Sequence, residues 1–232
     1  MARKPTRGGQ RGARRGAARK AAPANPRDRV IDALMMLAAG RSFASIGLAD
    51  VAAEAGVSLA DLRELYDGKL SILADFSKRV DKAVLSAGPP EGEGARDRLF
   101  DVLMRRLDML ARHKPALRRL ARSARCDPGL ACGLYRISEK SMMWMLVGAG
   151  IHHGGFLGKV AVRGTVLVFA EAMSAWLDDD DAGLAKTMAT LDKALRRGER
   201  AMGFIGEVCD LARSFTRRDG RRRGSQGAKA AG

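Results

Sequence analysis

Apolar residues recur every three or four positions through most of the chain, which is the spacing of one face of an α-helix. Strand-like alternation is nearly absent, and only 7 of the 232 residues are proline. The pattern therefore predicts an all-α fold. The expected helices span residues 26–39, 48–55, 58–65, 69–86, 95–111, 115–125, 128–151, 157–177, 182–197 and 199–216.

A Gly- and Pro-rich segment, residues 88–94 (GPPEGEG), divides this pattern into two parts. We expect a small helical domain over residues 25–87 and a larger helical domain over residues 95–216. The basic segments at residues 1–24 and 217–232 lack apolar periodicity and are predicted to be disordered tails.

Within the first part, residues 50–66 read DVAAEAGVSLADLRELY. Gly56 can take the positive φ of a sharp turn between two helices, and Ser58 suits the N-cap of the second helix. Val51 and Leu62 are the expected apolar contacts between the two helices. This is the outline of a helix-turn-helix, whose second helix can enter a DNA major groove.

The net charge of +16 lies almost entirely in the tails. Residues 1–22 contain eight Lys or Arg and no acid, and residues 213–232 have a net charge of +6, which leaves about +2 for the folded body. Basic tails attract polyanions, either DNA phosphates or an anionic membrane surface. A solubilising tail without a fixed partner is the alternative.

Little in the sequence indicates catalysis. Cys126, Cys132 and Cys209 form no CxxC pair and have no nearby His at metal-ligand spacing, so we expect buried thiols in a reducing compartment and no metal. No nucleophile, base and orienting group form a recognisable set, and no cofactor motif is present. The N-terminus lacks an apolar signal core, and no stretch reaches 18 uninterrupted apolar residues. These features favour a cytoplasmic protein that is not an enzyme.

Residues 27–86 resemble the TetR-type transcriptional regulators. The resemblance is carried by Phe43, Asp50-Val51-Ala52, Ala55-Gly56-Val57-Ser58, Leu62, Tyr66, Lys69, Leu70 and Leu73. It implies a three-helix DNA-binding domain joined to a helical ligand-binding and dimerisation domain, with repression that a small ligand relieves. It also implies a homodimer that binds double-stranded DNA.

The resemblance places a set of side chains at the DNA. Those on or beside the groove are Ser58, Leu59, Asp61, Leu62, Arg63 and Tyr66, with Lys69 reaching a phosphate. The N-terminal tail, with Arg14, Arg15, Arg19 and Lys20, would follow the DNA backbone or enter the minor groove.

Several positions depart from the family pattern. Gly47 stands where the family has Ser or Thr, and Ala49 where it often has Lys or Arg. The second helix carries Asp61 and Glu64 against one Arg63, and acidic side chains are repelled by phosphates. Carboxylates can nevertheless accept hydrogen bonds from cytosine, so base recognition stays open.

Two Met- and Trp-rich stretches suggest where a small apolar ligand binds. The candidate pocket residues are Met143, Trp144, Phe169, Met173 and Trp176. Flexible Met and large Trp side chains can line an adaptable pocket. Ordinary core packing is the alternative for each of them.

The second half also resembles the TetR-fold lipid-binding proteins of coenzyme Q biosynthesis. Trp176-Leu177-Asp178-Asp179 and Leu191-Asp192 carry this resemblance. It implies an alternative function as a lipid-binding accessory protein whose terminal amphipathic helix, residues 199–216, meets a membrane surface. The same helix could instead belong to the core or to a dimer interface.

Overall fold

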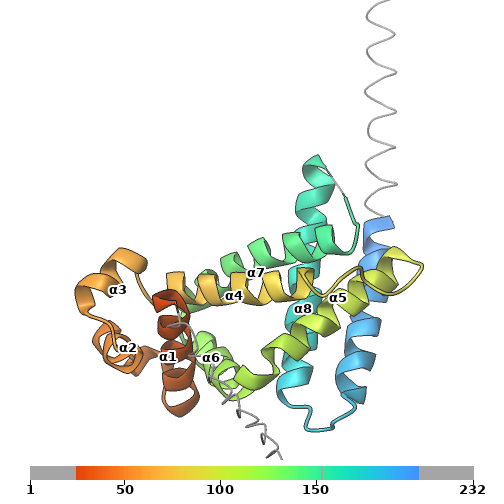
Figure 1. Ribbon diagram of the computed structural model, residues 1–232. Helices are drawn as coiled ribbons and strands as arrows, with labels where there is room; N and C mark the ends of the chain where they lie inside the picture. The colour runs from red at the N-terminus through yellow and green to blue at the C-terminus, as the bar shows by residue number, and fades with distance from the viewer. Residues whose placement is uncertain (1–24, 153, 204–232) are drawn as a thin grey trace, which may run out of the picture.

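The computed structural model describes residues 25–152 and 154–203, and these residues form helices, turns and loops without a strand. The N-terminal part contains α1 (Pro26–Gly40), α2 (Leu48–Ala55), α3 (Leu59–Leu65) and α4 (Lys69–Leu85). The rest contains α5 (Ala95–Leu110), α6 (Lys114–Cys126), α7 (Pro128–Gly148), α8 (Gly155–Leu177) and a last helix described over residues 185–203. The all-α fold class is confirmed (Figure 1).

Local signals in the sequence set several helix ends. The Asn25 side chain caps α1 by accepting from the Arg27 N–H at 3.1 Å. Asp127 caps α7 by accepting from the Leu130 N–H at 2.9 Å, and Pro128 occupies the first helical position. Each cap satisfies an N–H that the first turn of a helix cannot satisfy itself. The predicted starts of both helices are confirmed.

The first three helices enclose a small core. Val30, Leu34 and Val51 are fully buried, and Phe43 folds back from the α1–α2 connection to join them. The expected contact of Val51 with Leu62 fits their burial, because both side chains are 2% exposed or less. This packing fixes α2 and α3 against α1.

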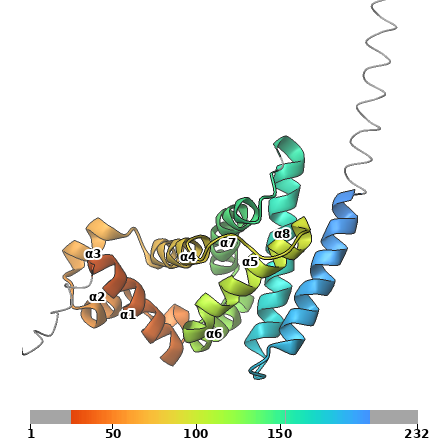
Figure 2. The ribbon, with the colours of Figure 1, turned by 45° about the vertical axis from the view of Figure 1, so that its right-hand side comes forward.

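The helices from α5 onward bury further apolar side chains, and these join the buried residues of α1 to α4 in one hydrophobic core, since α1 packs on α6. In these helices the most deeply buried large side chains are Leu103, Leu107, Met142, Met145, Trp176 and Leu191. α8 and the last helix lie side by side in both views (Figure 2). By length and composition alone α8 could cross a membrane. It nevertheless packs against α5, α6 and α7, as a core helix does.

One predicted helix boundary is wrong. The last helix passes through Gly198 without interruption, whereas the sequence pattern predicted separate helices over 182–197 and 199–216. A glycine inside a helix costs about 1 kcal/mol relative to alanine. Burial of Leu191, Ala194 and Leu195 along the inner face outweighs that cost. Residues 204–216 of the predicted terminal helix, and Cys209, lie outside the described residues. Cys126 and Cys132 are exposed, so the predicted burial of these two thiols is wrong.

α4 connects the two parts and packs closely on α7. A Cβ on Gly133 would lie 2.7 Å from Leu70, and one on Gly148 would lie 2.7 Å from Leu85. Two glycines on α7 therefore allow α4 to approach at both of its ends. Between these points a buried polar cluster joins the helices, since Asp81 accepts from Arg106 and from Ser141.

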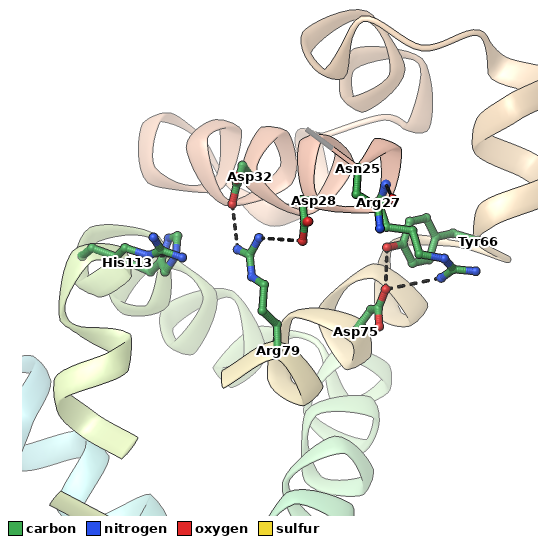
Figure 3. A network of polar contacts seen from close by, with 9 residues as sticks. Asn25, Arg27, Asp28, Asp32, Tyr66, Asp75, Arg79 and His113 are labelled. Atoms are coloured by element: carbon green, nitrogen blue, oxygen red, sulfur yellow. Dashed lines mark hydrogen bonds and ion pairs between the residues drawn. The ribbon is translucent and has the colours of Figure 1, made fainter. Parts of the chain in front are cut away.

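Ion pairs also tie α4 to α1 (Figure 3). Arg79 donates to Asp32 at 2.7 Å and to Asp28 at 3.4 Å. Asp75 accepts from the Tyr66 hydroxyl at 2.7 Å and from Arg27 at 3.3 Å. A shift of α4 would therefore be transmitted to α1 and to the end of α3.

Candidate nucleic-acid interface

The turn between α2 and α3 has the geometry that the sequence predicts. Gly56 adopts φ +61°, and the Val57 N–H donates to the Ala52 carbonyl at 3.0 Å. A side chain is strained in this left-handed conformation, so glycine suits the position. Arg29 from α1 donates to the Gly56 carbonyl at 3.4 Å, which places a cation beside the turn.

Reciprocal hydrogen bonds fix the start of α3. The Asp61 N–H donates to the Ser58 hydroxyl oxygen at 3.0 Å, and the Ser58 hydroxyl donates to the Asp61 carboxylate at 2.7 Å. The Ser58 N–H also donates to this carboxylate, at 3.3 Å. The negative charge of Asp61 is thus held at the positive end of the helix dipole. Its repulsion of phosphates is weaker there than the sequence alone suggests.

The outer face of α3 consists of exposed side chains, namely Ser58, Leu59, Ala60, Asp61, Arg63 and Glu64. Leu59 is 58% exposed, which leaves an apolar surface able to meet a thymine methyl group. Arg63 donates to Asp67 at 2.6 Å, and both side chains are largely exposed. This face is compact and presents few free cations.

Three residues predicted to contact DNA point inward instead. Leu62 is 2% exposed and packs in the small core. The hydroxyl of Tyr66 is bound to Asp75, and burial raises the pKa of Tyr66. Leu62 and Tyr66 are therefore buried beneath the outer face of α3 and are not part of that face.

Lys69 is the third of these residues, and its predicted phosphate contact does not fit the structure. Its ammonium group donates to the carbonyls of Phe43 and Ile46, each at 2.7 Å. It also lies 4.5 Å from the centre of the Phe43 ring. The ammonium group is thus bound to two carbonyls of the α1–α2 connection, of which that of Phe43 also accepts the Ile46 N–H at 3.4 Å. Lys69 therefore ties α4 to this connection.

The start of α2 is held by Asp50, although Gly47 has no side chain to cap the helix. The Gly47 N–H donates to the Asp50 carboxylate at 2.8 Å, and Arg41 pairs with the same carboxylate at 3.2 Å. The backbone hydrogen bond from Gly47 and the nearby charge of Arg41 lower the pKa of Asp50. Asp50 therefore supplies the reciprocal half of a capping box, whereas no side chain among the described residues accepts from the first-turn N–H groups of α2.

Sequence reasoning missed Arg29 and Arg41 as cations beside the motif. Neither lies within residues 50–66, and only the packing of α1 on α2 brings them there. The predicted DNA-binding arm, with Arg14, Arg15, Arg19 and Lys20, lies outside the described residues.

The predicted ligand pocket is not one cavity. On α7, Met143 and Trp144 are 46% and 50% exposed, whereas Met142 and Met145 are fully buried. On α8, Phe169 and Trp176 are core residues and Met173 is partly buried against the core. The stretch around Trp144 is apolar on every side of the helix, so periodicity could not show which side chains face inward. Met143 and Trp144 belong to two different surface cavities.

Comparison with known proteins supports the fold. No protein-family model matches the sequence, and no curated protein matches it. Among solved structures, a TetR transcriptional regulator from Nitrosomonas europaea ATCC 19718 superposes with a TM-score of 0.58 at 20% identity. The alignment covers 75% of this chain and 98% of that chain.

Two further solved structures agree. A TetR transcriptional regulator from Rhodococcus sp. RHA1 has a TM-score of 0.56 at 19% identity, over 75% of this chain and 95% of that one. A TetR-family transcriptional regulator from Streptomyces coelicolor has a TM-score of 0.52 at 18% identity, over 82% of this chain and 87% of that one. The described residues therefore have the fold of the TetR-type transcriptional regulators.

Proposed function

We propose that this protein is a dimeric DNA-binding transcriptional regulator, acting as a repressor that a small apolar ligand controls. The observation that carries the proposal is the α2–turn–α3 unit, which holds a short helix with an exposed outer face on a rigid three-helix core. A helix supported in this way can enter a major groove. The cytoplasm is the compartment where such a protein meets DNA.

In this proposal the outer face of α3 reads bases and the basic N-terminal tail supplies attraction. Ser58, Leu59 and Arg63 are the side chains best placed to meet base edges, since all are exposed on α3. Residues 1–22 carry a charge of +8 and would neutralise phosphates. Selectivity and affinity would thus come from different segments of the chain.

The proposed homodimer would use the exposed side of α8. Leu167 and Phe156 on this helix are 68% and 67% exposed, which is unusual for large apolar side chains. A second copy that covers this side would bury them and set the distance between two α3 helices. Light scattering at micromolar concentration, with Leu167→Glu as the disrupting variant, measures this directly.

The function is tested with DNA and membranes side by side. A mobility-shift titration uses the DNA upstream of the gene, and liposome co-sedimentation uses anionic vesicles. The proposal predicts a specific complex with the upstream DNA that survives excess unrelated DNA. Binding to vesicles without a specific DNA complex would instead support the lipid-binding alternative, and with it the membrane as partner.

A further inference from the structure

A surface groove runs along the contact between α4 and α7. Its volume is about 660 Å³, which lies within the range of small-molecule sites. One end is formed by Leu65, the last residue of α3, with Tyr66 and Asp67 directly after it, and the other end by Leu85 and Ser86. We call this cavity the α4–α7 groove.

The walls of the α4–α7 groove are largely apolar. Leu65, Ala74 and Leu85 contribute from one side, and Ile137 and Trp144 from α7. Trp144 is 50% exposed and Leu85 is 39% exposed, so large apolar surfaces are open to water here. An aliphatic chain that covered them would gain the free energy of their burial.

The carboxylates of the groove are already neutralised. Asp75 is bound by Tyr66 and Arg27, as Figure 3 shows. Asp81 is bound by Arg106 and by the Ser141 hydroxyl, at 2.7 Å for the latter. Asp67 is paired with Arg63. None of these three acids is left to attract a cation.

The lysines of the groove, unlike its carboxylates, are not paired with an opposite charge among the described residues. Lys78 and Lys82 on α4 and Lys140 on α7 are exposed at its rim. None of their ammonium groups makes a hydrogen bond or ion pair with any residue in the described part of the chain. Three ammonium groups thus surround an apolar surface without a protein partner, which is complementary to an apolar ligand bearing an anionic group.

We infer that the α4–α7 groove is a binding site for a single-chain amphipathic anion. The aliphatic chain lies against Trp144, Leu85 and Ile137, and the anionic group is held by Lys78, Lys82 and Lys140. The regulatory meaning of this site rests on the proposed function, whereas the binding itself does not.

The position of the groove gives such a ligand a direct route to the DNA-binding unit. The ligand would contact the turn after α3 and lie beside Arg27 and Asp75, which tie α1 to α4. A ligand shifts an equilibrium only by binding two states differently. A movement of α4 relative to α1 would change the shape of this end of the groove, and two such states would then differ in affinity for the ligand.

The test uses the fluorescence of Trp144 in the full-length chain, with decanoate as the probe and no DNA present. The chain has two tryptophans, and the other, Trp176, is buried in the core. Decanoate below its micellar concentration should cause a saturable change in emission. Decanol, of the same chain length but uncharged, should bind at least fivefold more weakly, since it gains no charge-assisted contact.

Variants separate the groove from other surfaces. Lys82→Gln combined with Lys140→Gln should weaken decanoate binding roughly five- to tenfold, as expected for two partly exposed charge pairs. The matched control, Lys186→Gln with Lys193→Gln on the last helix, should leave it unchanged. In Trp144→Phe the emission change should vanish. Calorimetry should still detect decanoate binding, with an affinity within about threefold of that of the unaltered protein, because an apolar ring is kept.

Three results would overturn the inference: no saturable binding of decanoate, equal affinity for decanoate and decanol, or an emission change that persists in Trp144→Phe. Because DNA is absent from this titration, its result is independent of whether the protein binds DNA. A second titration, of decanoate into a DNA complex, then tests the regulatory role alone.

Discussion

The outer face of α3 and the α4–α7 groove have opposite arrangements of charge. Around α3 the cations are engaged, since Arg63 pairs with Asp67, Arg41 pairs with Asp50, and Lys69 binds two carbonyls. In the groove the carboxylates are engaged and the lysines have no partner within the described residues. A paired charge stabilises the fold, whereas an unpaired one is available to a ligand.

This difference separates two tasks. In the proposed function, the motif that meets DNA presents little free positive charge, so the basic tails would supply much of the attraction. The groove presents free positive charge on an apolar surface, which suits a small anion better than a nucleic acid. The following changes test this contrast, from the largest expected effect to the smallest.

Asp81→Ala should have the largest effect on stability. It leaves the Arg106 guanidinium buried without its carboxylate, and breaking a buried ion pair in this way costs about 3–5 kcal/mol. Chemical denaturation followed by circular dichroism measures the loss. Asp67→Ala is the matched control, because its ion pair is exposed and contributes about 0–1 kcal/mol. Equal losses in the two variants would show that Asp81 does not neutralise a buried charge.

Lys69→Met should destabilise the protein by about 1–3 kcal/mol, because the Ile46 carbonyl loses its donor, whereas the Phe43 carbonyl keeps the Ile46 N–H. The salt dependence of DNA binding should stay as it is in the unaltered protein, since the ammonium is held by two carbonyls. Denaturation and a mobility-shift titration at several salt concentrations measure both quantities. If the variant instead showed a shallower salt dependence of DNA affinity and unchanged stability, Lys69 would be a phosphate contact as the sequence predicts.

Asp67→Asn should change stability by less than about 1 kcal/mol, since it removes only an exposed pair. It frees Arg63 for DNA, so affinity for the upstream DNA should rise a few-fold. Glu54→Gln, which removes an exposed acid on α2 that makes no ion pair with a described residue, serves as the control for net charge. An equal rise in both variants would mean that net charge, not the release of Arg63, determines affinity.

The smallest expected effect is that of Asp50→Asn on the way the free energy of unfolding depends on pH. The Gly47 N–H and Arg41 lower the pKa of Asp50 in the folded state. The resulting stability is fully present above the pKa of an unfolded aspartate, about 3.9, and is lost as the pH falls through the lower folded value. The variant should therefore lose less stability on acidification than the unaltered protein does. Identical slopes of stability against pH would rule out this contribution.

The fold was largely predictable because its signals are local. Gly56, Ser58 and the Asp127-Pro128 pair each mark a turn or a cap through their own backbone and side-chain chemistry. Gly198 misled the prediction, since the same residue type stays helical when the residues before it bury an inner face. Local signals cannot report that tertiary packing.

The site was less predictable because side-chain direction depends on distant residues. Lys69 turns inward to carbonyls more than twenty positions earlier in the chain, which no spacing rule reveals. The buried Arg106 had a signal, because it falls on the same face as Leu99, Leu103 and Leu110. A charged residue at such a core position indicates a buried partner, here Asp81 of another helix.

The most direct test of the account compares the full chain with a chain lacking residues 1–22, on the upstream DNA and on unrelated DNA across a range of salt concentrations. The account predicts that the shortened chain binds both more weakly, with a shallower dependence of log affinity on log salt. It should keep its preference for the upstream DNA, because α3 supplies the selectivity. An unchanged salt dependence, or a preference lost with the tail, would contradict this division between tail and helix.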